Sequence, residues 1–252
     1  MKTLIVLLFA FALVKVNAQL TAPDAITTSK GKVIVQPIFH AALVLQWNDK
    51  SVYVDPNNGA EAYKTLQKPD LVLITDIHGD HMDLKTLQAL DLSNATLVVP
   101  QAVADKLPAE WKQKIIVLNN GNTIEQSGVS ISAVPMYNLP NDSTARHTKG
   151  RGNGYVLDMG GKKFYISGDT EDIPEMRSLK NIDVAFVCMN LPFTMSVEQA
   201  ASAVLEFKPK IVYPYHFRGQ GGFSDIQQFK TLVNKGDASI DVRLKDWYAG
   251  GK

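Results

Sequence analysis

The sequence predicts a layered α/β fold in which two β-sheets lie between helices. Apolar runs of strand length alternate with helical patterns after residue 70, whereas the part up to residue 54 is rich in strands. No linker rich in Pro, Gly or Ser divides the 252 residues, so we expect one domain over 19–252. The hydrophobic fraction of 45% is ordinary for a globular chain and supplies enough apolar residues for a core.

The first half of the chain reads as strands with two short helices between them. Residues 70–75, DLVLIT, form an apolar run that is typical of a strand buried on both faces. The run at 84–90 has helical spacing, and Asp83 precedes it as a candidate N-cap. A second short helix is expected over 101–107. The other expected strands of this half are 33–38, 42–47, 51–54, 95–100 and 114–118.

The second half contains a predicted hairpin and two predicted helix starts. The segment GYVLDMGGKKFYIS places two apolar runs around Gly160-Gly161, as in a β-hairpin. Two Ser-x-x-Gln capping boxes predict helices, one from Ser196 to Gln199 and one from Ser224 to Gln227. A further helix is expected to begin near Pro174, and strands are expected at 129–137, 183–189 and 210–215.

Charge and cysteine content exclude several kinds of protein. The formal charge is +1, from 26 basic and 25 acidic residues, so nothing favours a nucleic-acid partner. Cys188 is the single cysteine, which excludes an internal disulfide framework and a metal site built from cysteines alone. We therefore expect a small-molecule substrate as partner, and the oligomeric state stays open.

The first 18 residues have the pattern of a secretory signal peptide. Lys2 precedes an apolar run from Leu4 to Val14, and the small residue Ala18 ends the segment. The run is too short for a bilayer span, which needs about 20 residues. We therefore expect an exported protein, periplasmic or secreted, with no stable membrane anchor after cleavage.

Polar residues that bind metals follow four of the apolar strands. Strand ends in layered α/β folds tend to meet at a ligand site, so these segments are expected to converge. Imidazole and carboxylate together suit zinc, manganese and iron. One metal could take Asp76 and His78, and a second could take Asp80 and His81. The remaining candidates are Asn138, with His147 nine residues later, Asp169 and His216.

Three of these segments resemble the metallo-β-lactamase superfamily. TDIHGDH, at 75–81, resembles its signature T-H-x-H-x-D-H, and SGDT, at 167–170, resembles its later element with a bridging Asp. YPYHF, at 213–217, resembles its last histidine segment. Val54-Asp55-Pro56 is similar to the strand end found in ascorbate-6-phosphate lactonase-like hydrolases. The resemblance implies a four-layer αββα sandwich with a dinuclear metal site at one edge.

The resemblance also implies a role for each ligand. His78 would hold the first metal, Asp80, His81 and His216 the second, and Asp169 would bridge both. Two positions depart from the family pattern. Asp76 replaces its first histidine, and such a harder ligand shifts preference towards manganese or iron, or weakens the site. Asn138 replaces a later histidine, for which His147 is the candidate substitute. One metal and two of unequal affinity both stay open, with zinc as the expected element.

Other residues are candidates to support the ligands or to bind substrate. Asp55 is expected to hold the metal loop from behind through hydrogen bonds, with a turn-forming Asp-Pro as the alternative. His40 is a candidate for the same role, and a structural histidine without contact to the site is the alternative. The cationic loop with Arg146, Lys149 and Arg151 suits a phosphate or carboxylate group, although a solvated basic loop is an equal alternative. Asn138 is also a candidate donor to a substrate oxygen.

Together these features predict a metal-dependent hydrolase. Asp80 and Asp169 would act as catalytic residues that steer a metal-activated water onto the substrate. The bond cleaved would be an ester, lactone, amide or phosphodiester bond of a small molecule, and we weakly prefer an anionic one. The alternative is a non-catalytic metal- or ligand-binding protein on the same scaffold, because a fold does not fix a function.

Overall fold

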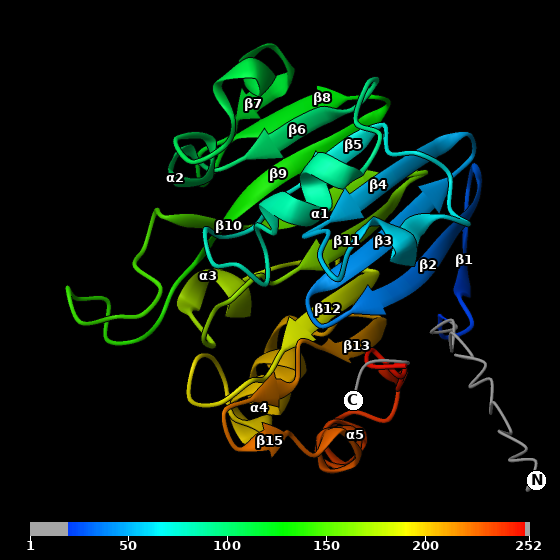
Figure 1. Cartoon of the computed structure of the whole chain (residues 1–252). Coiled ribbons are helices and arrows are strands. Elements are labelled where there is room, and N and C mark those ends of the chain that lie inside the picture. The colour runs from blue at the N-terminus through cyan, green and yellow to red at the C-terminus, as the bar shows by residue number, and fades with distance from the viewer. Residues whose placement is uncertain (1–19, 250–252) are drawn as a thin grey trace, which may run out of the picture.

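The computed structural model describes residues 20–249, so the predicted signal peptide at 1–18 lies outside the described residues. Two seven-stranded sheets face each other, and helices lie on their outer sides (Figure 1). This arrangement confirms the expected four-layer αββα sandwich. Among residues 20–249, no helix has both the length and the apolar character needed to cross a bilayer.

The first sheet begins as an antiparallel meander and continues as parallel strands. The turn at Asn48-Asp49, where Asn48 has φ 54°, joins two of the predicted strands. Beyond the fourth strand each connection crosses over through a helix or loop, and the pairing becomes parallel. In spatial order the strands are β1 (Asp24–Thr28), β2 (Gly31–Phe39), β3 (Ala42–Trp47), β4 (Lys50–Val54), β5 (Leu71–Leu73), β6 (Thr96–Val99) and β7 (Ile115–Val117).

The second sheet has the same mixed design. The predicted hairpin is present as β10 and β11, with Gly160 and Gly161 both at positive φ in its turn. Strands from β8 to β11 pair antiparallel, and the rest pair parallel. The strands are β8 (Thr123–Gln126), β9 (Val129–Met136), β10 (Gly152–Met159), β11 (Lys162–Ile166), β12 (Val184–Cys188), β13 (Ile211–Tyr215) and β16 (Asp241–Val242); β14 (Arg218–Gly219) and β15 (Gly222–Phe223) form a separate ribbon.

The apolar core has two parts. One lies between the sheets and continues under the outer helices of the second sheet, and the other lies under the outer helices of the first sheet. Strand β5 shows the division, because Leu71 and Leu73 face the second sheet whereas Val72 faces the other way. All three residues are buried, as expected for a strand covered on both faces. The strand ends that carry the polar residues are thereby held rigidly at one edge of the sandwich.

Five α-helices and two short 3-10 helices are described. Asp83 caps the first of them and Ser196 opens a complete capping box, so both predictions are confirmed. The second predicted box is wrong by one residue, because Asp225 is the N-cap and Ser224 instead donates to the Met189 carbonyl. The helices are α1 (Leu84–Ala89), α2 (Gln101–Ala104), α3 (Pro174–Arg177), α4 (Val197–Phe207), α5 (Ile226–Gly236), η1 (Ala60–Tyr63) and η2 (Ala109–Lys114).

Candidate metal centre

Loops from both sheets bring the predicted ligands together at one edge of the sandwich. Asp76, His78 and His147 form a first cluster, and His81, Asp169 and His216 form a second. A third cluster consists of His40, Asp80 and His216. Within each cluster the ligand atoms lie no more than 4.8 Å from one another. All seven predicted ligands therefore lie in neighbouring positions, although they span 140 residues of sequence from Asp76 to His216.

Unusual backbone angles aim several of these residues at the centre. Asp55, His40 and His216 have φ values of 45°, 54° and 48°, which are uncommon for residues other than glycine. Gly168, at φ 61°, lets the chain turn directly before Asp169, and a Cβ there would approach the sulfur of Met136 to 2.7 Å. Such strained angles persist where the surrounding structure enforces them, and they concentrate at functional sites.

Asp55 and Thr75 determine which nitrogen of His81 faces the centre. The Thr75 hydroxyl donates to Asp55 Oδ2 at 2.6 Å, and His81 Nδ1 lies 2.8 Å from the same oxygen. A carboxylate oxygen only accepts, so Nδ1 carries a hydrogen, and in the neutral ring that binds a metal Nε2 keeps its lone pair. That Nε2 lies 3.2 Å from Asp169 Oδ2 and 3.1 Å from His216 Nε2. Asp55 thus lies behind His81 and binds its Nδ1, and the roles of the two residues at a metal site stay predictions.

Asn138 fixes His147 in the same way. Its Oδ1 accepts the backbone N–H of His147 at 2.8 Å, while its Nδ2 donates to the Phe193 carbonyl at 2.9 Å. The amide orientation is therefore fixed, and His147 Nδ1, 2.9 Å from the same Oδ1, must donate. The lone pair of His147 Nε2 then faces Asp169 Oδ2 at 3.1 Å. His147 lies in the first cluster, and Asn138 lies behind it.

These contacts place acceptors against acceptors, which is the arrangement that a bound cation requires. The facing Nε2 and carboxylate lone pairs repel one another unless a positive charge lies between them. His147 Nε2 and Asp169 Oδ1 are moreover buried without a hydrogen-bond partner. Nitrogen and oxygen donors at this spacing fit a divalent transition metal, so the residues present suit the metal that the sequence predicts.

The electrostatic environment also favours positive charge. Burial alone would raise the pKa of Asp169, but His216, His81 and His147 hold it well below its ordinary value. Burial would lower the pKa of His81, but Asp169 and Asp55 raise it well above the ordinary value. The pKa of His216 is raised by Asp169 and Asp80 in the same way, against the effect of burial. The centre therefore stabilises added positive charge, whether a proton or a metal ion.

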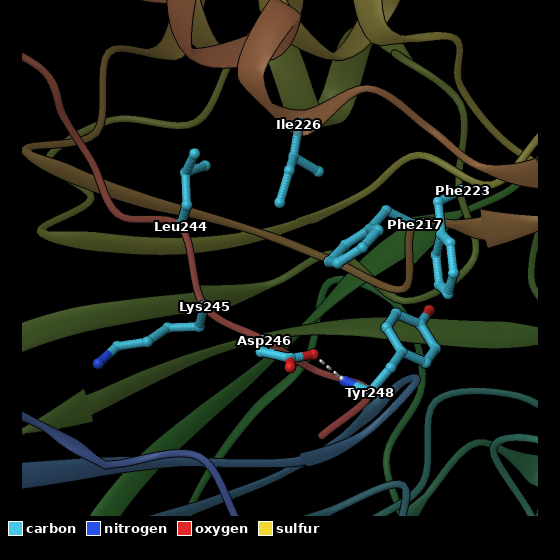
Figure 2. A pocket seen from close by; sticks show the side chains of 7 residues that line it. All are labelled: Phe217, Phe223, Ile226, Leu244, Lys245, Asp246 and Tyr248. Atoms are coloured by element: carbon cyan, nitrogen blue, oxygen red, sulfur yellow. Dashed lines mark hydrogen bonds between the residues drawn. The ribbon is translucent and has the colours of Figure 1, made fainter. Parts of the chain in front are cut away.

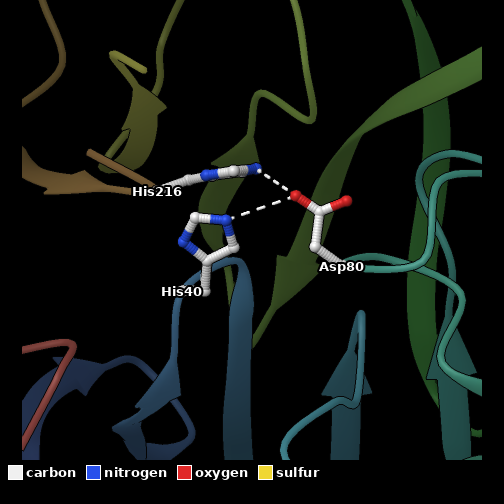
Figure 3. A group of neighbouring side chains, drawn as sticks. All are labelled: His40, Asp80 and His216. Atoms are coloured by element: carbon white, nitrogen blue, oxygen red, sulfur yellow. Dashed lines mark ion pairs between the residues drawn. The ribbon is translucent and has the colours of Figure 1, made fainter. Parts of the chain in front are cut away.

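Asp80 is held by a chain of hydrogen bonds that begins near the C-terminus. Asp80 Oδ2 only accepts, so the hydrogen of the neutral His40 ring lies on Nε2, and His40 Nδ1 accepts from the Tyr248 hydroxyl at 2.8 Å. The Tyr248 oxygen in turn accepts the backbone N–H of Arg218 at 3.1 Å. His40 Nε2 then donates to Asp80 Oδ2 at 3.2 Å, and His216 Nε2 lies 3.5 Å from the same oxygen (Figure 3). Burial lowers the pKa of His40 to about 4 despite Asp80, so the ring is neutral at pH 7.

Asp76, at the position of the family's first histidine, is paired with Arg151. Arg151 Nε donates to Asp76 Oδ1 at 3.0 Å, and the terminal nitrogen Nη2 donates to Oδ2 at 2.9 Å. His78 Nδ1 lies 2.8 Å from Oδ2. Burial alone would raise the pKa of Asp76, but His78, His81 and Arg151 lower it. The carboxylate is thus charged, buried and shared between a guanidinium and the first cluster.

The residues expected to bind substrate have different surroundings. Arg146 is exposed and lies over the Phe193 ring, 4.3 Å from its centroid, and exposed Lys149 pairs with Glu175. Arg151 uses its nitrogens on Asp76 and on the Arg146 carbonyl. Substrate binding by this loop stays a prediction. The centre is open to solvent at His78 and Asp80, whose side chains are 29% and 41% exposed.

An apolar pocket of about 410 Å³ adjoins the chain of hydrogen bonds at Tyr248 (Figure 2). The rings of Phe217, Phe223 and Tyr248 pack against one another at its wall, with centroids 4.8–5.9 Å apart. Phe217 directly follows His216, and Tyr248 binds His40, so the wall is connected to the centre. The sequence carried no motif around Tyr248, and although Thr75 opens the TDIHGDH segment, its contact with Asp55 appears only once distant segments meet.

Known proteins share this chain's sequence and fold over most of its length. Residues 35–216 match the family described as a β-lactamase superfamily domain. A UPF0173 metal-dependent hydrolase of Pyrococcus abyssi is 31% identical over 223 residues, which cover 84% of this chain and 96% of that protein. A similar protein of Staphylococcus carnosus is 31% identical over 220 residues, covering 80% and 94%.

Solved structures agree. A protein of Parabacteroides distasonis, described as a metal-dependent hydrolase, is 40% identical with a TM-score of 0.79, covering 90% of this chain and 99% of that one. Igni18, a metallo hydrolase of Ignicoccus hospitalis, shares the fold with a TM-score of 0.70 at 23% identity, covering 84% and 94%. The narrower resemblance to ascorbate-6-phosphate lactonase-like enzymes stays a prediction. The chain belongs to the β-lactamase superfamily and, within it, to the UPF0173 family of metal-dependent hydrolases.

Proposed function

We propose that this enzyme is exported and hydrolyses an ester, lactone, amide or phosphodiester bond of a small molecule. The facing lone pairs of His81 Nε2 and Asp169 Oδ2, 3.2 Å apart in a buried cluster, are the observation that carries the proposal. They need a positive charge between them, which a proton or a bound metal ion can supply, and the neighbouring His78 and Asp80 side chains are 29% and 41% exposed to solvent. A buried, accessible cation is what a hydrolytic metal site requires.

The proposed chemistry divides between the metal and the protein. A divalent cation, for which zinc is our first choice, lowers the pKa of a coordinated water from 15.7 to about 7 and polarises the substrate. Asp169 stays anionic and faces both clusters, so it balances the positive charge. Asp80 is the more exposed carboxylate, and its Oδ2 is fixed by His40 at 3.2 Å. Its other oxygen has no hydrogen-bond or ion-pair partner among residues 20–249, and it would accept a proton from the attacking water and pass it to solvent.

Two features support a choice of substrate class. Arg146 and Lys149 are exposed beside His147 and suit an anionic group. The pocket at Phe217 and Tyr248 suits an apolar group. We propose a small substrate with an anionic group. Because the pocket suits an apolar group, neutral acyl esters are included as comparison substrates in the test.

Export is a separate part of the proposal. It rests on the Lys2 start, the apolar run to Val14 and Ala18. Mass spectrometry of protein purified from its native host should find an N-terminus beyond residue 18. Detection of Met1 in that protein would contradict export by cleavage.

Hydrolysis is tested with a panel of model substrates. The panel contains nitrophenyl acetate, nitrophenyl esters of longer acids, a lactone and bis-nitrophenyl phosphate. Metal-loaded protein should turn over at least one of them, and a chelator should abolish the turnover. The double variant Asp169→Ala, His216→Ala serves as the matched protein without the second cluster. Equal rates for this variant and the wild type would defeat the proposal, and tight metal binding without turnover would favour the non-catalytic binder.

A further inference from the structure

Arg151 forms an ion pair with Asp76, which is one of the candidate metal ligands of the first cluster. Its Nε and Nη2 bind the two oxygens of Asp76 at 3.0 and 2.9 Å. Its third nitrogen, Nη1, binds the Arg146 carbonyl at 2.7 Å, which fixes the plane of the guanidinium. The side chain of Asp76 is fully buried, and that of Arg151 is 19% exposed. The pair is therefore a fixed, two-point ion pair and not a mobile surface contact.

The oxygen shared with Arg151 is also the one that faces the first cluster. Asp76 Oδ2 lies 2.8 Å from His78 Nδ1 and 4.0 Å from His147 Nε2. A cation held by these three residues would draw on an oxygen whose charge the guanidinium already balances. It would also lie close to the guanidinium charge in a buried setting, where the repulsion between like charges is strong.

The second cluster has no such competing cation. Asp169 pairs with His81, His147 and His216, and across residues 20–249 no lysine or arginine lies within ion-pair distance of it. The two clusters therefore differ in charge, although His147 of the first cluster also lies 3.1 Å from Asp169 of the second. The first contains a carboxylate that is already neutralised, and the second contains one that is surrounded by imidazoles.

We propose that Arg151 makes the two metal positions unequal, so that the first cluster binds a divalent cation more weakly than the second. The inference rests on the metal dependence within the proposed function and not on hydrolysis. Arg151 acts as a positioning residue, because it works through Asp76. The physical cause is the guanidinium charge, so a neutral side chain at this position relieves the effect and a lysine retains it.

The test is calorimetric titration of metal-free protein with Zn²⁺ and with Mn²⁺, together with elemental analysis of the bound ions. Wild-type protein should bind one ion tightly and a second at least about tenfold more weakly, or only one detectably. Arg151→Gln should tighten the weaker ion about tenfold, whereas Arg151→Lys should leave it weak. Lys149→Gln is the matched loss of charge in the same loop, and it should change neither affinity, since Lys149 pairs with Glu175.

His78→Ala identifies the weaker position, because His78 belongs to the first cluster alone. This variant should lose the weak ion and keep the tight one. Loss of the tight ion in His78→Ala would overturn the inference. Wild-type affinities for the two ions that agree within threefold would overturn it too, and neither result depends on whether Arg151→Gln folds. An unchanged or weaker second ion in folded Arg151→Gln would overturn it as well. Absence of any bound ion would also overturn the proposed function, whereas two equal ions would overturn this inference alone.

Discussion

Single side chains behind the ligands decide what the ligands can do. Asp55 and Asn138 each accept a hydrogen from the Nδ1 of a histidine and leave its Nε2 lone pair for the centre. Tyr248 does the opposite to His40, because its hydroxyl donates to Nδ1 and makes Nε2 a donor to Asp80. The three histidines are chemically the same residue, but their neighbours give them two different functions.

Removal of the Tyr248 hydroxyl should loosen Asp80. In Tyr248→Phe, His40 loses the hydrogen bond that fixes its Nδ1, so its Nε2 no longer has to donate to Asp80. We expect up to about tenfold weaker zinc binding, because partners behind metal ligands contribute at this level. Calorimetric titration of the metal-free variant measures the effect.

Tyr213→Phe is the matched control for that experiment. It also removes a buried hydroxyl, but this hydroxyl bonds Asp24 at 2.7 Å and lies outside the clusters. Its zinc affinity should equal that of the wild type. Equal affinity in both variants would show that the Tyr248 hydroxyl has no part in fixing Asp80.

At the scale of elements, the central strands, the edge strand β7 and the longer helices were predicted well, whereas the edge strands β1, β8 and β16 were missed. Strands such as β5 and β12 are apolar throughout because both faces are covered. The missed strands β1 and β8 lie at sheet edges; β1 alternates between buried and exposed residues, and β8 between half-buried and exposed ones. β16 has two residues and no pattern to read. Edge strands carry polar residues because one side faces water, so their sequences resemble loops.

The start of α5 gives a direct test of which residue caps it. Asp225 Oδ1 accepts the backbone N–H groups of Gln227 and Gln228, both at 2.9 Å. Asp225→Ala should lower the free energy of unfolding by about 1 kcal/mol. Gln227→Ala should change it by less than about 0.5 kcal/mol, because no capping box with Ser224 exists. Urea denaturation measures the free energy of unfolding of both variants. A larger loss in Gln227→Ala than in Asp225→Ala would support the capping box predicted from the sequence.

Asp183 joins the beginnings of three strands and should make stability depend on pH. Its carboxylate binds Lys162 at 2.9 Å, Lys210 at 2.8 Å and the backbone N–H of Lys163 at 3.0 Å. Burial alone would raise the pKa of Asp183, but these three donors lower it. Because the folded pKa is the lower one, the contribution is present above the unfolded value of about 3.9 and is lost as pH falls below it.

Asp183→Asn should therefore lower the free energy of unfolding by about 1–2 kcal/mol at pH 7. The difference from wild type should shrink as the pH falls from about 5 to 3, since protonation removes the same charge from the wild type. Urea denaturation at a series of pH values measures the difference. A difference that stays constant over this range would contradict a role for the Asp183 charge.

On the scale of the whole molecule, the metal centre joins the two sheets. Asp76, His78 and His81 follow β5 of the first sheet, whereas Asp169 and His216 follow β11 and β13 of the second. A cation held by both groups would bind the folded chain and not the unfolded one. Ligand binding of this kind stabilises by about 2.7 kcal/mol at a concentration of 100 Kd.

Removal of metal should therefore lower the melting temperature of the entire protein by roughly 5–10 °C. Differential scanning calorimetry with and without EDTA measures the shift, and added zinc should restore it. The Asp169→Ala, His216→Ala variant lacks the second cluster and keeps only the weaker first one, so its melting temperature should change much less between the two conditions. A wild-type melting temperature that ignores EDTA would contradict a metal that joins the sheets.

The sequence alone determined the layered fold, the central strands and the set of candidate ligands. These follow from local properties, namely apolar runs, capping residues and the order of Asp and His after strand ends. Only the tertiary structure decided that His147 and not Asn138 enters the first cluster, that Tyr248 reaches His40, and that Arg151 pairs with Asp76. Such contacts join residues far apart in the chain, and the side chain that fills a given position depends on how the two sheets pack.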